Sequence, residues 1–161
     1  MIKKLMLSGF EKEESLSLIN SSLELNSNRE TYSSLDISIL DLYTGQAEII
    51  KSGACNTYIK NKNTVKRVSL ESLPVGISER MELKSETISI EEDDILLMCS
   101  DGVLESKNET KEDWIERFLK NINTNNVQKL ADYILAEAID NSYGVAKDDM
   151  TVIVCKIVKK K

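Results

Sequence analysis

The stretch LLMCSDG at residues 96–102 runs an apolar segment directly into an Asp-Gly turn. The apolar residues over 94–99 do not alternate with polar ones, which favours a strand that is covered on both faces. The carboxylate of Asp101 therefore follows the C-terminal end of a buried strand. This stretch determines how the rest of the chain is interpreted.

A second pair of carboxylates, Asp148 and Asp149, directly precedes the last apolar run of the chain, residues 150–158. In antiparallel neighbours the end of one strand lies beside the start of the other. If strands 94–99 and 150–158 are such neighbours, the carboxylates meet at one edge of a sheet. Carboxylates there need a cation or hydrogen-bond donors, and Mg²⁺ and Mn²⁺ prefer such oxygen ligands. An ordinary Asp-Gly turn and a solvated loop end stay open as the alternative.

The hydrophobic pattern predicts helices, then strands, then helices and a last strand. Helical spacing of apolar residues covers 1–8, 11–25, 111–120 and 126–140. Two hairpins, 33–43 with 47–50 and 57–60 with 64–68, are followed by strands at 85–90, 94–99 and 150–158. This order indicates a layered α+β fold. We expect one domain over residues 1–161, with the sheets and flanking helices in 33–158.

Composition excludes several classes of protein. The 161 residues carry a net charge of -6, which disfavours nucleic-acid binding because phosphates attract an excess of Lys and Arg. No apolar run is long enough to span a bilayer, so we expect no membrane contact from this segment. The absence of His excludes His-based catalysis. Cys55, Cys99 and Cys155 lack C-x-x-C spacing, which predicts reduced core residues and a cytoplasmic location.

Taken together, the motifs resemble a known family. SDGV at 100–103 after an apolar strand, followed by KDDMTV at 147–152 in a final strand, is similar to the C-terminal half of the PPM metal-dependent protein phosphatases. Further stretches resemble, in the same order, the phosphatase domain of stage II sporulation protein E, one branch of that family. They are residues 32–42, 51–54, 73–77 and 113–114.

The resemblance implies a PPM-like β-sandwich flanked by helices, with a two-metal centre that takes Mn²⁺ or Mg²⁺. It implies a phosphatase acting on phosphoserine or phosphothreonine, with metal-activated water as the nucleophile. Asp101 and Asp148 correspond to catalytic metal ligands, and Asp149 is a weaker candidate at the metal site. Gly102 would let the backbone approach the metals closely.

One departure from the family pattern is clear. The first metal motif of the family, Asp-Gly-x-Gly, has no counterpart, because the only Asp-Gly dipeptide here is Asp101-Gly102. We therefore expect a domain truncated at its N-terminus, with weak metal binding and little or no activity alone. The resemblance further implies a parent protein that is anchored in the membrane through upstream segments.

The resemblance also implies partners. The substrate would be a phosphorylated anti-sigma-factor antagonist in sporulation signalling. Uncovered strand edges favour a homodimer, and residues 1–25 correspond to a helical switch or dimer contact. Simple core packing of Leu16, Ile19 and Leu23 is an equal alternative for that segment. The alternative function is a non-catalytic regulatory or interaction module that keeps the phosphatase fold.

Overall fold

The computed structural model describes residues 1–25, 32–62, 64–79, 81, 83–105, 114–146 and 148–158. Asp113 and Lys147, which belong to the motifs above, lie outside these residues. The chain divides into two compact units. The first contains Met1–Ile37, Ile50–Ala54 and Leu70–Ser85, and the second contains Ser38–Ile49, Cys55–Ser69 and Glu86–Lys161. That residues 1–161 form one domain stays a prediction.

A four-stranded antiparallel sheet organises the second unit. Its strands are β3 (Thr57–Lys60), β4 (Val65–Val68), β6 (Ile95–Cys99) and β7 (Val152–Lys156), in the order β4-β3-β6-β7. Strand β6 is interior, with Leu97 opposite Tyr58 of β3 on one side and Val154 of β7 on the other. The interior position of β6 explains why its residues form an uninterrupted apolar run in the sequence.

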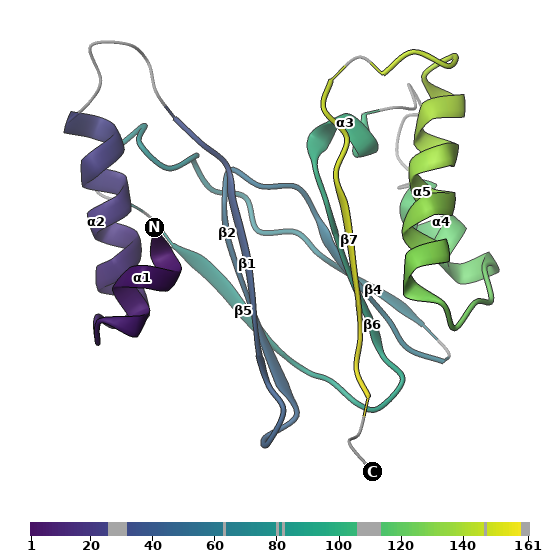
Figure 1. Ribbon diagram of the computed structural model, residues 1–161, viewed down its shortest axis with the longest axis horizontal. Coiled ribbons are helices and arrows are strands. Elements are labelled where there is room, and N and C mark those ends of the chain that lie inside the picture. The colour runs from purple at the N-terminus through teal and green to yellow at the C-terminus, as the bar shows by residue number, and fades with distance from the viewer. Residues whose placement is uncertain are drawn as a thin grey trace. The chain divides into compact units, whose positions relative to one another are not determined.

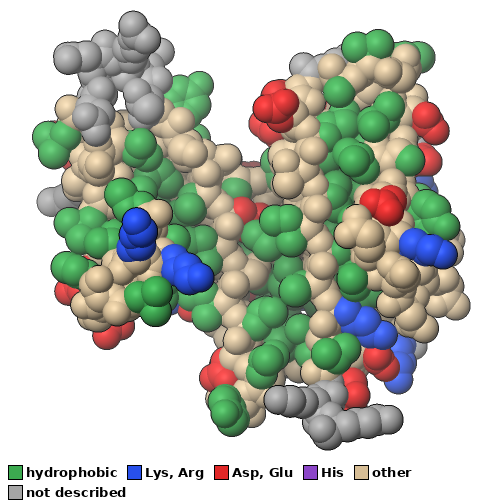
Figure 2. Space-filling view, viewed as in Figure 1, with side chains coloured by type: hydrophobic (Ala, Val, Ile, Leu, Met, Phe, Trp, Pro, Cys, Tyr) green, Lys and Arg blue, Asp and Glu red, His purple; other side chains and the backbone are tan. Residues whose placement is uncertain are grey.

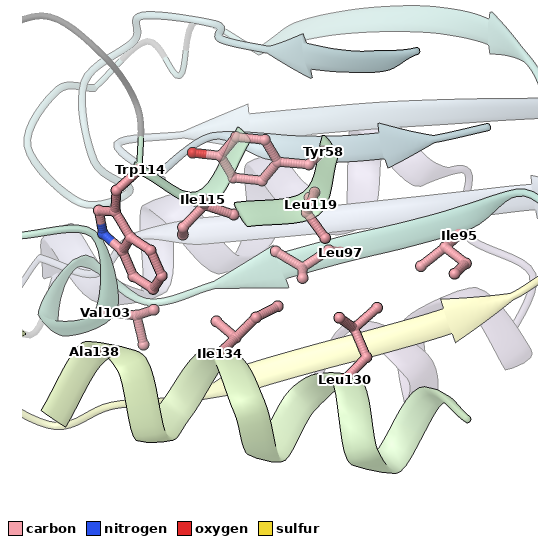
Figure 3. Packing of buried hydrophobic residues seen from close by; sticks show 10 residues of the cluster. All are labelled: Tyr58, Ile95, Leu97, Val103, Trp114, Ile115, Leu119, Leu130, Ile134 and Ala138. Carbon is pink, nitrogen blue, oxygen red and sulfur yellow. The ribbon is translucent and has the colours of Figure 1, made fainter. Parts of the chain in front are cut away.

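Helices α4 (Trp114–Asn121) and α5 (Val127–Asn141) bury one face of this sheet. Figure 3 shows Leu97 of β6 surrounded by side chains of both helices. The side chain of Asn126 caps α5 by accepting a hydrogen bond from Lys129 N at 3.0 Å. Among the described residues, one cluster of ten buried side chains fills the space between this sheet and the helices: Tyr58, Ile95, Leu97, Val103, Trp114, Ile115, Leu119, Leu130, Ile134 and Ala138.

Helices α1 (Ile2–Leu7) and α2 (Lys12–Leu25) belong to the first unit. Leu16 of α2 is fully buried, whereas Leu18 is 46% exposed. Asn20 of α2 accepts a hydrogen bond from Gly76 N at 2.8 Å and donates one to the Ser78 carbonyl at 2.9 Å. The helix is thereby joined to the loop that follows Pro74. Figure 2 shows hydrophobic side chains at the surface of these two helices.

Strands β1 (Leu35–Asp41), β2 (Gln46–Ser52) and β5 (Lys84–Ser89) form a three-stranded sheet in the order β1-β2-β5. Lys51 of β2 is fully buried, and its amino group lies 2.7 Å from a carboxylate oxygen of Asp36 on β1. The carboxylate of Asp36 thus supplies the negative charge that the buried ammonium group of Lys51 needs.

Most elements agree with the sequence patterns to within a few residues, and two features differ. Residues 101–104, read from the sequence as a turn, form the short helix α3 (Asp101–Leu104) at the end of β6 (Figure 1). No disulfide joins the three cysteines. Cys155 is exposed and Cys55 is only half-buried, so the prediction of core residues was wrong for these two, whereas the half-buried Cys99 packs against the core. Cys155 alternates with the inward residues of β7 and faces away from the helices.

Candidate metal centre

The register of β6 and β7 brings the two carboxylate segments to one edge of the sheet. Cys99, the last residue of β6, pairs with Val152, the first residue of β7. Because the strands are antiparallel, the chain leaves β6 toward Asp101 at the place where it enters β7 from Asp149. The predicted meeting of these segments is what the structure shows, and both lie within the second unit.

Ser100 joins the two segments through its side chain and its backbone. Its hydroxyl donates to the Asp149 carbonyl at 2.9 Å and accepts from Thr151 N at 2.9 Å. Its backbone N–H donates to the Thr151 carbonyl at 3.0 Å. These three bonds extend the pairing beyond the last ladder residues and hold the carboxylate segments in a defined register.

Gly102 lies directly against the segment that precedes β7. A Cβ built on this glycine would lie 2.6 Å from the Asp149 carbonyl oxygen and 3.3 Å from the Asp148 carbonyl carbon. Both obstacles are backbone atoms, so no side-chain rotation could make room. Gly102 therefore lets these two backbone segments lie close together, and its close approach to a metal stays a prediction.

Asp101 and Asp148 are exposed, and their carboxylates have matching environments. One oxygen of Asp101 accepts from Gly102 N at 3.0 Å, and one oxygen of Asp148 accepts from Asp149 N at 2.7 Å. The second oxygen of each makes no hydrogen bond to another described residue. Asp149 is also exposed, but it contributes its backbone carbonyl to Ser100.

The donor set fits part of a site for a hard divalent cation. Carboxylate oxygens are the ligands that Mg²⁺ and Mn²⁺ prefer, and Mg²⁺ often binds through one or two carboxylates while keeping several waters. No group of three or more Asp, Glu, Cys or His side chains that could hold a metal occurs in the described ranges. The residues present therefore make a partial centre with few protein ligands.

Sequence reasoning missed the role of Ser100. It lies just before Asp101 in extended conformation and is the N-cap residue of α3, yet its side chain makes no cap hydrogen bond. A serine before Asp-Gly suggests a helix cap. Only the pairing with the β7 segment shows that the Ser100 hydroxyl instead bonds to the backbone of Asp149 and Thr151.

The amino-acid sequence of the chain is similar to sequences of known proteins. The sequence model described as Stage II sporulation protein E (SpoIIE) matches residues 1–158, nearly the whole chain. The chain belongs to the SpoIIE family. A SpoIIE protein from Priestia megaterium is 34% identical over 159 residues, which are 98% of this chain and 27% of that protein. The chain thus spans about a quarter of the length of this curated relative.

Solved SpoIIE structures share the fold. The PP2C phosphatase domain of SpoIIE from Bacillus subtilis, solved with a fragment of its regulatory domain, matches with a TM-score of 0.87 and 33% identity. That match covers 98% of this chain and 48% of the solved one. A manganese-presoaked phosphatase domain of the same protein matches with a TM-score of 0.75 and 30% identity, over 99% and 73% of the two chains. The predicted α+β phosphatase fold is confirmed.

None of the helices in the described residues has both the length and the apolar character that a membrane span requires. The longest is α5, with 15 residues.

Proposed function

We propose that this SpoIIE-family chain is the metal-binding part of a serine/threonine protein phosphatase. One observation carries the proposal: the Asp101-Gly102 turn lies against the backbone of Asp148-Asp149, with Ser100 hydrogen-bonded to both Asp149 and Thr151. An edge with two acidic segments in backbone contact has the ligand chemistry that a divalent cation needs. The manganese-presoaked SpoIIE relative supports manganese as the metal.

The residues of this chain bind and position the metal. Asp101 and Asp148 would each offer the oxygen that is not engaged by the following N–H. Gly102 keeps the two backbones close together, and Ser100 fixes their register. Bound Mn²⁺ or Mg²⁺ supplies Lewis-acid neutralisation of charge on a phosphoryl group. Asp149 is the weaker candidate for a metal ligand, because its contact with Ser100 is made by its backbone carbonyl and not by its carboxylate.

We expect these 161 residues alone to turn over substrate poorly. A two-metal phosphatase needs more carboxylates than the pair found here, and the chain has a single Asp-Gly dipeptide, at 101–102. Weak metal affinity would follow from the small number of protein ligands.

The proposed substrate is a phosphorylated anti-sigma-factor antagonist, which rests on the family resemblance. We also propose a homodimer, supported by the exposure of Met6, Leu7 and Phe10 on and beside α1 and of Leu18 on α2. Exposed apolar side chains in a group favour a protein contact. The three cysteines form no disulfide with one another, which supports a reducing compartment, the cytoplasm.

Manganese binding tests the proposed function directly. Mn²⁺ is titrated into the 161-residue protein and the free ion is followed by electron paramagnetic resonance. Asp101→Asn and Asp148→Asn should each weaken binding by about tenfold or more, as expected when a charged ligand is lost. Asp132→Asn, an exposed carboxylate on α5, is the charge-matched control. Equal affinity in all four proteins would refute the metal centre.

Phosphatase activity is tested separately. Phosphate release from a phosphoserine protein is measured for the 161 residues and for a chain extended by a family hairpin bearing Asp-Gly-x-Gly. We expect turnover only in the extended chain, and loss of it with Asp101→Asn. Normal turnover by the 161 residues alone would contradict the expectation of low activity.

A non-catalytic regulatory or interaction module is the second candidate. The lack of a three-acid cluster among the described residues favours it. It predicts no Mn²⁺ binding at Asp101 and Asp148, and no activity after extension of the chain, so the two experiments discriminate between the candidates.

A further inference from the structure

A polar pocket lies at the end of the four-stranded sheet that is opposite the candidate metal centre. It has a volume of about 470 Å³ and is lined by residues 60–62 and 64–65 of the β3–β4 hairpin, by Asp93 and Ile95, and by residues 120–125 at the end of α4 and in the loop after it. All these segments belong to the second unit. The volume falls within the range of roughly 300–1,000 Å³ that is typical of small-molecule sites.

Lys60 places a positive charge at the pocket without a carboxylate partner among the described residues. Its amino group donates to the Leu119 carbonyl at 2.5 Å and to the Ile122 carbonyl. These carbonyls end α4, where the helix dipole favours a cation. Partial burial lowers the pKa of Lys60 by desolvation. An anion in the pocket would compensate this charge.

The other charged groups leave the pocket with an excess of positive charge. Lys62 and Lys120 also line it, and Lys120 is paired with Glu116 of its own helix at 2.7 Å. Asp93 is the acid that lines the described part of the pocket, and it is already paired with Lys156 at 2.9 Å. The exposed Glu91 and Glu92 of the same turn are not among the lining residues. Figure 2 shows such basic and acidic side chains close together near the N-terminal end of α5.

The chemistry of the lining favours one class of anion. Its donors are lysine ammonium groups and the amides of Asn61, Asn121, Asn123 and Asn125, and neither Arg nor an aromatic residue is among the described residues that line it. Lysine acts as a point charge for phosphate, whereas planar recognition of carboxylates is typical of arginine. The lack of an aromatic ring disfavours stacking of a nucleobase.

We propose that this pocket binds a small phosphate-bearing molecule without an aromatic ring. The site is distinct from the candidate metal centre, since Lys60 pairs with Ile95 at the first residue of β6 while Asp101 follows the last. The proposal is therefore independent of the proposed phosphatase function. It places a separate ligand site at the turn end of the β3–β4 hairpin.

The test is a nuclear magnetic resonance titration of the 161-residue protein with glycerol phosphate and with inorganic pyrophosphate, each at constant ionic strength. We expect saturable shifts of the backbone amides of residues 60–65 and 120–125. The double variant Lys62→Gln/Lys120→Gln should weaken binding by about tenfold or more, because two charge-assisted hydrogen bonds are lost. Both side chains are exposed, so the fold should persist.

Lys3→Gln/Lys4→Gln on α1 is the matched control, because it removes two exposed lysines from the other unit. It should bind both probes as the unchanged protein does. The proposal is overturned if neither probe gives saturable shifts at concentrations up to about 10 mM, where even very weak complexes form. It is also overturned if Lys62→Gln/Lys120→Gln and Lys3→Gln/Lys4→Gln bind equally well.

Discussion

Gly102 packs against Asp149 so closely that a methyl group at position 102 would lie 2.6 Å from the Asp149 carbonyl oxygen. Gly102 is in helix α3 and has no positive φ, so the requirement for glycine here comes from space and not from backbone conformation. The contact between the acidic segments thus depends on the absence of one side chain.

Gly102→Ala should therefore destabilise the protein. Alanine normally stabilises a helix by about 1 kcal/mol relative to glycine, but forcing a methyl group against backbone should cost about 1–3 kcal/mol. We expect a lower urea midpoint and weaker Mn²⁺ binding. Gly144→Ala is the control: its added Cβ meets nothing within 4 Å, so its cost comes only from a φ of +77°. A stabilised Gly102→Ala variant would contradict the close contact.

Ser100→Ala tests the hydrogen bonds that hold β7 in register with the acidic turn. The change removes a donor to Asp149 and an acceptor for Thr151, both at 2.9 Å. Because both bonds are exposed and water can replace them, a loss of about 0.5–1.5 kcal/mol in the free energy of unfolding is expected. Chemical denaturation measures it, and Mn²⁺ affinity should fall as well. Ser89→Ala, on an exposed position of β5, should leave both quantities nearly unchanged.

Lys51→Met should be one of the most damaging single changes. It leaves the Asp36 carboxylate, only 17% exposed, without its cation at 2.7 Å, and breaking a buried pair in this way costs about 3–5 kcal/mol. The double variant Lys51→Met/Asp36→Leu removes both charges and should recover much of that loss. Urea denaturation of the three proteins gives the comparison. If the double variant is less stable than Lys51→Met, the ion pair is not the source of the effect.

Asp93→Asn tests the exposed ion pair with Lys156, and its effect should depend on pH. The hydrogen bond and charge of Lys156 lower the pKa of Asp93 below its ordinary value of 3.8. A depressed carboxyl pKa stabilises the folded state above pH 3.8, and this contribution is lost as pH falls through the folded-state pKa. The difference in Tm between Asp93→Asn and the unchanged protein should thus be largest near neutral pH and shrink toward pH 2.

Asn is a suitable replacement at this position because Asp93 has a φ of 74°, which Asn also tolerates. Added salt should reduce the difference at neutral pH, because exposed pairs are screened. A Tm difference of the same size at pH 7 and at pH 2 would exclude the ion pair as its cause.

Local patterns predicted much of the fold. The uninterrupted apolar run at 94–99 indicated an interior strand, and β6 is flanked on both sides. The helical spacing of residues 126–140 matched α5 within one residue. Periodicity could not show that Lys51 is buried, since a lysine in a strand normally reads as solvent-facing. Its burial depends on Asp36, which is a distant residue in sequence.

For the candidate centre, the sequence by itself determined which residues carry the carboxylates: Asp101 after one apolar run, and Asp148-Asp149 before another. Only the tertiary structure decided that they meet, that Ser100 bridges them and that Gly102 has no room for a side chain. The physical reason is that the type of each side chain is given by its own position in the sequence. The proximity of the two acidic segments instead arises from the pairing of β6 with β7, which are separated by more than fifty residues of chain.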